Sequence, residues 1–238
     1  MAGYLIEFRI RGYAKRYARS LIYDVAKKFH VRGVTHKSKV VPHITMYGPF
    51  RTYKQKDVVN ALQNVCSKYN SVPFTFKGFN YFDNAKNKVV YLDIEPSEKL
   101  VNLRYELSKA LLPITSTISK EDKRGRDDFK FHSTIAFKDI DYKFRNIWNY
   151  IKEKERPNIK QRLLRVTLLR NGKILYEYDL LQQRLLNRKE ALSRLIFMKT
   201  IKMMKDNYEE AEDYQIYKKQ EAKAKESILI RIKNLFKV

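Results

Sequence analysis

The stretch VVPHITMYGPF, residues 40–50, places His43 inside an apolar run that has the composition of a β-strand. Thr45 follows two residues later. A second stretch, FKFHSTIAF at residues 129–137, repeats this arrangement with His132 and Thr134. Because side chains alternate between the faces of a strand, each histidine shares a face with its threonine. The chain has only 4 histidines, so two matched settings predict one shared site built by two strands.

The two His-x-Thr pairs contain the groups needed to cleave or form a phosphodiester without a metal ion. One neutral imidazole can take a proton from an attacking water or alcohol, and one imidazolium can protonate the leaving oxygen. The two hydroxyls can donate to the nonbridging phosphate oxygens, where charge builds in the transition state. Nothing in the motifs tells which histidine is the base.

A structural role for the histidines is the alternative, because a single His-x-Thr is an unspecific pattern. His36 and Ser38 match His-x-Ser within the polar stretch THKSK, which has no strand character. Burying a neutral imidazole without partners costs on the order of a few kcal/mol, so two buried histidines at matched spacing favour function. Neither motif has the cysteine or carboxylate neighbours that metal sites require. We therefore predict no metal and no cofactor.

The composition points to an anionic partner. The net charge is +24, from 50 Lys and Arg against 26 Asp and Glu. Nucleic acid is the first candidate and an acidic membrane surface the second, although a generally basic proteome would give the same charge. Cys66 is the single cysteine, which fits a reducing compartment. No stretch resembles a signal peptide or a membrane span, so we predict a soluble, cytoplasmic protein that does not enter the membrane.

Periodicity and turn signals predict an α+β order of elements. We expect strands at 4–10 and 40–47, the second ended by Gly48-Pro49, and helices at 13–30, 54–69, 97–112 and 141–153. Ser97 is a candidate N-cap. Hairpins are expected at 74–96 and at 163–181, where Asn171-Gly172 forms the turn. Residues 1–182 are predicted to form the catalytic domain and residues 183–238 a basic helical extension without strands.

The paired motifs PHITMYGPF and FHSTIAF resemble the two signature motifs of the two-histidine (2H) phosphoesterase superfamily. Among its members they are most similar to the archaeal and bacterial 2′-5′ RNA ligase / RNA 2′,3′-cyclic phosphodiesterase family. The hairpin FTFKGFNYF…KVVYLDIEP between the motifs extends the resemblance, which covers about residues 1–182. The resemblance implies two pseudo-symmetric lobes with antiparallel sheets around a central cleft, one His-x-Thr on each wall.

The resemblance also implies a function. The substrate would be an RNA with a 2′,3′-cyclic phosphate end, such as a tRNA or another structured RNA, opened by hydrolysis or joined to a 5′-hydroxyl. By motif position, His43 and His132 are the catalytic acid/base pair, and Thr45 and Thr134 bind phosphate. Two alternatives remain open: a noncatalytic basic RNA-binding module, and a 2H enzyme acting on a small cyclic nucleotide or a 2′-5′ oligonucleotide.

Further substrate contacts are expected near the two motifs. By alternation, Tyr47 shares the face of His43 and could stack on a base, or it could be an ordinary core residue. Lys130 shares the face of His132 and could reach a phosphate, or it could be solvated. A basic loop before the second motif could grip RNA or face solvent; its residues are Lys120, Lys123, Arg124 and Arg126.

The extension has three candidate roles: RNA contact, packing on the catalytic domain, or self-association through its helices. Its apolar stripe predicts that part of it is buried. The stripe consists of Leu185, Leu192, Leu195 and Ile196, followed by Ile228, Ile232 and Leu235.

Overall fold

The computed structural model describes residues 2–35, 40–84, 87–117 and 119–208, together with residues 219, 222 and 226. In chain order its main elements are β1 (Gly3–Arg9), α1 (Gly12–Phe29), β2 (His43–Arg51), α2 (Gln55–Cys66), β3 (Val72–Asn84), β4 (Asn87–Pro96), α3 (Glu98–Leu111), β5 (Ser116–Thr117), β6 (His132–Phe137), α4 (Phe144–Lys152), β7 (Ile159–Leu163), β8 (Arg165–Arg170), β9 (Lys173–Asp179), β10 (Arg184–Asn187), α5 (Arg188–Leu192) and α6 (Arg194–Tyr208).

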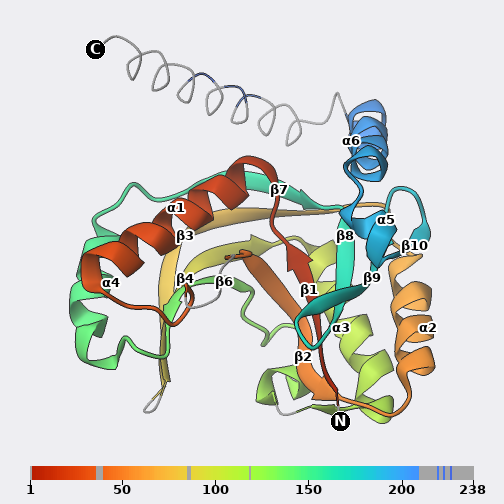
Figure 1. Ribbon diagram of the computed structural model, residues 1–238, viewed down its shortest axis with the longest axis horizontal. Helices are drawn as coiled ribbons and strands as arrows, with labels where there is room; N and C mark the ends of the chain where they lie inside the picture. Colours follow the sequence, from red (N-terminus) through yellow and green to blue (C-terminus); the bar gives the residue numbers. More distant parts are fainter. Residues whose placement is uncertain are drawn as a thin grey trace.

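The strands form two antiparallel sheets, one for each lobe (Figure 1). The larger sheet has the order β10-β9-β8-β1-β2-β5, and the smaller has the order β6-β4-β3-β7. Each sheet contains one histidine strand, β2 in the larger and β6 in the smaller. The predicted α+β fold with antiparallel sheets is therefore confirmed, and both predicted hairpins are present as β3–β4 and β8–β9.

The core follows from the alternation of side chains in β1. Tyr4, Ile6 and Phe8 are buried on one face of this strand, while Glu7 and Arg9 occupy the other. Helices α2 and α3 pack together beside the larger sheet, and α1 packs on β6 of the smaller one (Figure 1). Cys66 at the end of α2 is fully buried, and this burial raises the pKa of its thiol. The core thus leaves one face of β1 available for polar groups.

Strand β2 is longer than the sequence predicts. It continues through Gly48 and a cis peptide bond to Pro49, and ends at Arg51. The N–H of Gly48 donates to both carboxylate oxygens of Asp122, at 3.1 and 3.0 Å, and proline has no N–H to satisfy. Gly48 and Pro49, which usually end a strand, can therefore lie within β2. The Asp122 side chain takes the place of the strand partner that would otherwise accept the Gly48 N–H.

The prediction that no strand follows residue 182 is wrong, because β10 pairs with β9 at the edge of the larger sheet. In this short strand Leu186 is buried and Arg184 is exposed. The strand was missed because Leu185 also fits the apolar stripe predicted for a helix. Helices α5 and α6 do follow. However, Leu192 and Leu195 of the predicted stripe are 60% and 71% exposed. Ile196 packs on a small apolar cluster, and the predicted positions Ile228, Ile232 and Leu235 lie outside the described residues.

The charged loop before β6 is held by its acidic residues. Asp122 is buried and also accepts a hydrogen bond from the Thr117 hydroxyl. The fully buried Arg104 of α3 donates to the Glu121 carbonyl and lies over the Phe129 ring, 4.0 Å from its centroid. The loop is thereby fixed between β2 and the start of β6.

Two of the basic residues in this loop are engaged within the protein. Arg124 pairs with Glu121 at 2.9 Å, and Arg126 donates to Asn102 at 2.8 Å.

Among the helices of the described ranges, we find none with both the length and the apolar character needed to cross a bilayer.

We expect Asp122→Ala to lower the free energy of unfolding by about 1–3 kcal/mol, because it leaves the buried Gly48 N–H without its acceptor. Urea denaturation followed by circular dichroism measures this change. Asp127→Ala is the matched control: this carboxylate is 79% exposed, and its removal should change stability by less than about 0.5 kcal/mol. Equal stabilities of the two variants would contradict the anchoring role of Asp122.

Candidate active site

A cleft of about 530 Å³ lies between the two sheets and brings the two histidines together. His43 enters it from β2, and His132 with Thr134 enters it from β6. The open face of β1 contributes Glu7 and Arg9. Two motifs that are far apart in the chain therefore face one cavity, as the sequence predicted.

Both imidazoles are oriented by the same main-chain contact. Nδ1 of His43 lies 2.9 Å from the carbonyl oxygen of Val41, and Nδ1 of His132 lies 2.9 Å from that of Lys130. A carbonyl oxygen only accepts, so each Nδ1 carries the hydrogen. In the neutral form of each ring, Nε2 is then the nitrogen with a free lone pair. The two residues thus present the same nitrogen for proton transfer.

The two histidines differ in their surroundings. Nε2 of His43 lies 3.8 Å from Oε2 of Glu7, a carboxylate whose side chain is only 4% exposed. The other oxygen of Glu7 accepts a 2.7 Å hydrogen bond from Nε of Arg9. A proton on Nε2 of His43 would therefore be balanced by a nearby buried negative charge.

His132 instead lies against two aromatic rings. Its ring centroid is 5.0 Å from that of Phe82 and 5.1 Å from that of Tyr91. Burial lowers the pKa of His132, and the positive charge of His43 lowers it further. The lowered pKa of His132 thus favours the neutral form of the imidazole on β6.

The predicted period-two pattern holds at the middle residues of the two motifs. Ile44 and Ser133, the middle residues of the two motifs, are buried on the opposite faces of their strands. Thr134 lines the cleft beside His132. Thr45 is half-buried, pairs with Glu7 in the neighbouring strand, and is not among the described residues that line the cleft.

The two other predicted contact residues are placed differently. Tyr47 is fully buried, its hydroxyl lies 2.6 Å from Oγ1 of Thr115, and its ring is not accessible to a base in this structure. Alternation fails here because Met46 and Tyr47 are both buried beside a register shift between β1 and β2. Lys130 contributes its carbonyl oxygen to His132, while its side chain is exposed.

Glu7 and Arg9 were not identified as site residues from the sequence. Their signal is the run YLIEFRI, in which charged residues alternate with apolar ones inside a strand. The strand register places Glu7 opposite Thr45 and Arg9 opposite His43. Across the described ranges, no group of three or more His, Cys, Asp or Glu residues could hold a metal ion.

Two antiparallel sheets that each turn one His-x-Thr strand toward a common cleft define the architecture of a 2H phosphoesterase. Residues 22–174, well over half of the chain, match the sequence model of the 2′-5′ RNA ligase superfamily. The chain therefore belongs to this superfamily.

Comparison with individual proteins gives more distant similarities. Two relatives, from Geobacillus sp. (strain WCH70) and Geobacillus kaustophilus (strain HTA426), are each named "putative phosphoesterase". The first is 30% identical over 93 residues, which are 38% of this chain and 53% of the relative. The second is 27% identical over 119 residues, which are 48% of this chain and 62% of the relative. The chain thus spans between half and two thirds of each relative.

Among solved structures, TT0787 of Thermus thermophilus is similar over 75% of this chain and 98% of its own, with 15% identity and a TM-score of 0.49. Usb1 of Kluyveromyces marxianus, solved with uridine monophosphate, is similar over 78% of this chain and 98% of its own, with 11% identity and a TM-score of 0.45.

We expect His132 to titrate below the ordinary histidine pKa of about 6.5, because its ring is buried. His43→Gln should raise the pKa of His132, since it removes a neighbouring positive charge. Side-chain ¹⁵N NMR during a pH titration measures both effects and identifies the tautomer. His30→Asn, at the left-handed C-cap of α1, is the control and should leave His132 unchanged. If His43→Gln leaves the pKa of His132 unchanged, as the His30→Asn control does, the two histidines are not electrostatically coupled.

Proposed function

We propose that this protein is a metal-independent phosphoesterase that acts on RNA ends carrying a 2′,3′-cyclic phosphate. It would hydrolyse the cyclic phosphate to a phosphomonoester or join it reversibly to a 5′-hydroxyl through a 2′-5′ linkage. The observation that carries this proposal is the matched orientation of the two imidazoles, each held at Nδ1 by the main chain beside one cleft.

We assign the base to His132 and the acid to His43 in the ring-opening direction. Nε2 of His132 takes the proton from the attacking water or 5′-hydroxyl as its oxygen bonds to phosphorus. The bond from phosphorus to the 2′- or 3′-oxygen breaks, and Nε2 of His43 gives its proton to that oxygen. The lowered pKa of His132 and the buried carboxylate of Glu7 beside His43 support this order.

The phosphate would be held by hydroxyl and guanidinium donors. Thr134 lines the cleft and would donate to a nonbridging oxygen, and Thr45 occupies the equivalent motif position on β2. Arg9 also lines the cleft and offers charged donors. Donors placed where negative charge develops lower the barrier most effectively.

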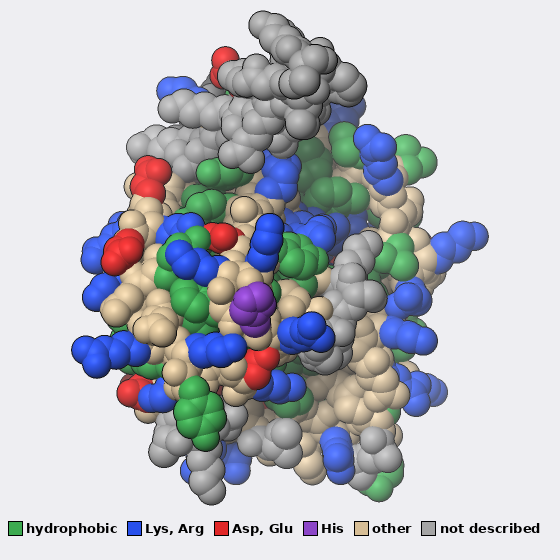
Figure 2. Space-filling view, turned by 60° about the vertical axis from the view of Figure 1, so that its left-hand side comes forward, with side chains coloured by type: hydrophobic (Ala, Val, Ile, Leu, Met, Phe, Trp, Pro, Cys, Tyr) green, Lys and Arg blue, Asp and Glu red, His purple; other side chains and the backbone are tan. Residues whose placement is uncertain are grey.

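A polymeric substrate is supported by the surface charge. Lysine and arginine side chains greatly outnumber acidic ones on the face shown in Figure 2, consistent with a net charge of +24. Such a surface attracts the phosphate backbone of RNA in a salt-dependent way. The same charge would serve a noncatalytic RNA-binding module, for which salt-dependent affinity without turnover is the distinguishing result.

The direct test is incubation with an RNA oligomer that ends in a 2′,3′-cyclic phosphate, in the presence of a chelator. Product mapping distinguishes a 2′-phosphate, a 3′-phosphate and a new 2′-5′ linkage. We expect His43→Ala and His132→Ala each to lower the rate by roughly 10²–10⁴-fold, since each removes one proton transfer. His30→Asn should retain the wild-type rate. Full activity in either cleft variant would rule out the paired mechanism.

The rate should depend on pH with a bell shape. Its acidic limb reflects protonation of the base His132, whose pKa is lowered, and its alkaline limb reflects loss of the proton from the acid His43. Glu7→Gln removes the negative charge beside His43, so the alkaline limb should move to lower pH while the acidic limb stays. A flat profile between about pH 5 and 8 is incompatible with this scheme.

A further inference from the structure

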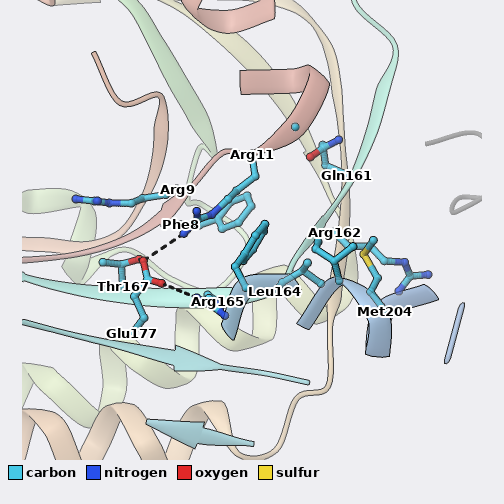
Figure 3. Close-up of a pocket in the computed structure, with 13 residues that line it drawn as sticks. Phe8, Arg9, Arg11, Gln161, Arg162, Leu164, Arg165, Thr167, Glu177 and Met204 are labelled. Carbon is cyan, nitrogen blue, oxygen red and sulfur yellow. Dashed lines mark hydrogen bonds and ion pairs between the residues drawn. The ribbon is translucent and has the colours of Figure 1, made fainter. Parts of the chain in front are cut away.

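A second cavity, of about 210 Å³, is shown in Figure 3 and shares Arg9 with the cleft. One wall is the segment from the end of β1 to the start of α1, and a second wall comes from β7 and β8. Helix α6 supplies a third wall through Phe197, Ile201 and Met204. These three residues lie beyond residues 22–174, the part of the chain that matches the superfamily. The cavity is therefore formed by residues within the superfamily match, from β7 and β8, together with segments that precede and follow it.

The wall formed by α6 is attached to the larger sheet by buried charges. Arg165 of β8 donates from Nε to Asp179 at 2.7 Å and from Nη2 to the hydroxyl of Thr200 at 2.8 Å. All three side chains are buried, with Thr200 reaching the network from α6. Because breaking a buried charged network is costly, this helix has a defined position on the sheet. The cavity is thus a built feature of the fold.

Arg11 is the residue of this cavity best placed to bind a ligand. Its guanidinium lies over the ring of Phe197, 4.5 Å from the centroid. Its Nη2 is 3.6 Å from Oε1 of Glu177, which is beyond hydrogen-bonding distance. That oxygen already accepts a 2.9 Å hydrogen bond from Thr167, and Arg165 lies 3.4 Å from the other oxygen. Arg11 is therefore a partly buried cation, and the carboxylate that pairs with it, Glu177, already accepts hydrogen bonds from Thr167 and Arg165.

Arg9 connects the cavity with the cleft, because it lines both. Its side chain points away from Arg11 in Figure 3 and bonds Glu7 through Nε. No other hydrogen bond of its guanidinium is made with the described part of the chain. In the strand register Arg9 lies opposite His43, and Arg11 follows two residues later, about 7 Å along an extended backbone. A chain of phosphates leaving the histidines would pass Arg9 and reach the cavity.

We propose that this cavity binds the base of the nucleotide that precedes the reacting RNA end, a proposal that rests on the function proposed above. The volume is below the roughly 300–1,000 Å³ typical of pockets for whole drug-sized ligands, which suits a single base. Unpaired bases stack on aromatic rings and on arginine planes. The ring of Phe197 is contacted by Arg11 at 4.5 Å and by Arg165 at 5.0 Å, so the plane offered to a base is the guanidinium of Arg11 supported by this ring. Nε of Arg9 bonds Glu7, so its remaining guanidinium nitrogens would contact both the reacting phosphate and the phosphate that links it to this nucleotide.

The test compares three substrates: uridine 2′,3′-cyclic phosphate, the dinucleotide ApU with the same cyclic end, and that dinucleotide with its adenine removed. We expect ApU to be used with a kcat/KM roughly 5- to 100-fold higher than the mononucleotide, the usual gain from stacking one base. The abasic dinucleotide should lose most of this gain on the wild-type protein. Phe197→Leu and Arg11→Gln should remove the gain for ApU while the mononucleotide rate stays within about 2-fold, which also shows that the variants are folded.

Matched controls come from exposed neighbours on the same helix. Met198→Leu and Lys199→Gln change residues that are solvent-exposed and do not line the cavity, so both should keep the full gain for ApU. The proposal is overturned if the wild type does not prefer ApU, or if the preference survives in both cavity variants.

Failure of the proposed function has a different outcome, namely no turnover of any of the three substrates by the wild type. In that case the cavity is tested by equilibrium binding of ApU with a 3′-phosphate. Tighter binding by the wild type than by Arg11→Gln would support the base site, and equal affinities would overturn it.

Discussion

The hydrogen bond from each histidine Nδ1 to a carbonyl two residues upstream is the constraint on which the site depends. It sets the tautomer and the direction of the imidazole with main-chain atoms, which vary little with side-chain substitutions elsewhere. Since both strands use the same bond, the two lobes deliver chemically identical groups. They differ in their surroundings: a buried carboxylate lies beside His43, and aromatic rings pack on His132. Two strands that orient their histidines in the same way thus place them in different environments.

The polar face of the larger sheet extends this logic beyond the cleft. Three polar residues lie side by side across β1, β8 and β9: Glu7, Thr167 and Glu177. Two residues further along β9, Asp179 accepts a hydrogen bond from Arg165. Buried charges of this kind need partners, and α6 supplies one of them through Thr200. The segment after the superfamily match is therefore connected to the site through the sheet itself.

Much of the fold could be predicted from the sequence because local signals agreed with the tertiary structure. The Ser97 cap, the Asn171-Gly172 turn and the two histidine strands are all present. Three features could not be predicted locally. Strand β2 passes Gly48-Pro49 only because Asp122, distant in sequence, accepts the Gly48 N–H. Tyr47 is buried because a register shift interrupts alternation. The alternation in YLIEFRI marks Glu7 as unusual, but its place beside His43 follows from the pairing of β1 with β2, which is not local in sequence.

Asp122 has a consequence for the cleft as a whole. Its carboxylate accepts hydrogen bonds from Gly48 of β2 and from Thr117 of β5, so the loop that leads to β6 is attached to the sheet that carries His43. These bonds lie outside the cleft, because Asp122 is not among the described residues that line it. One buried carboxylate thus supports both the strand of His43 and the loop that precedes His132.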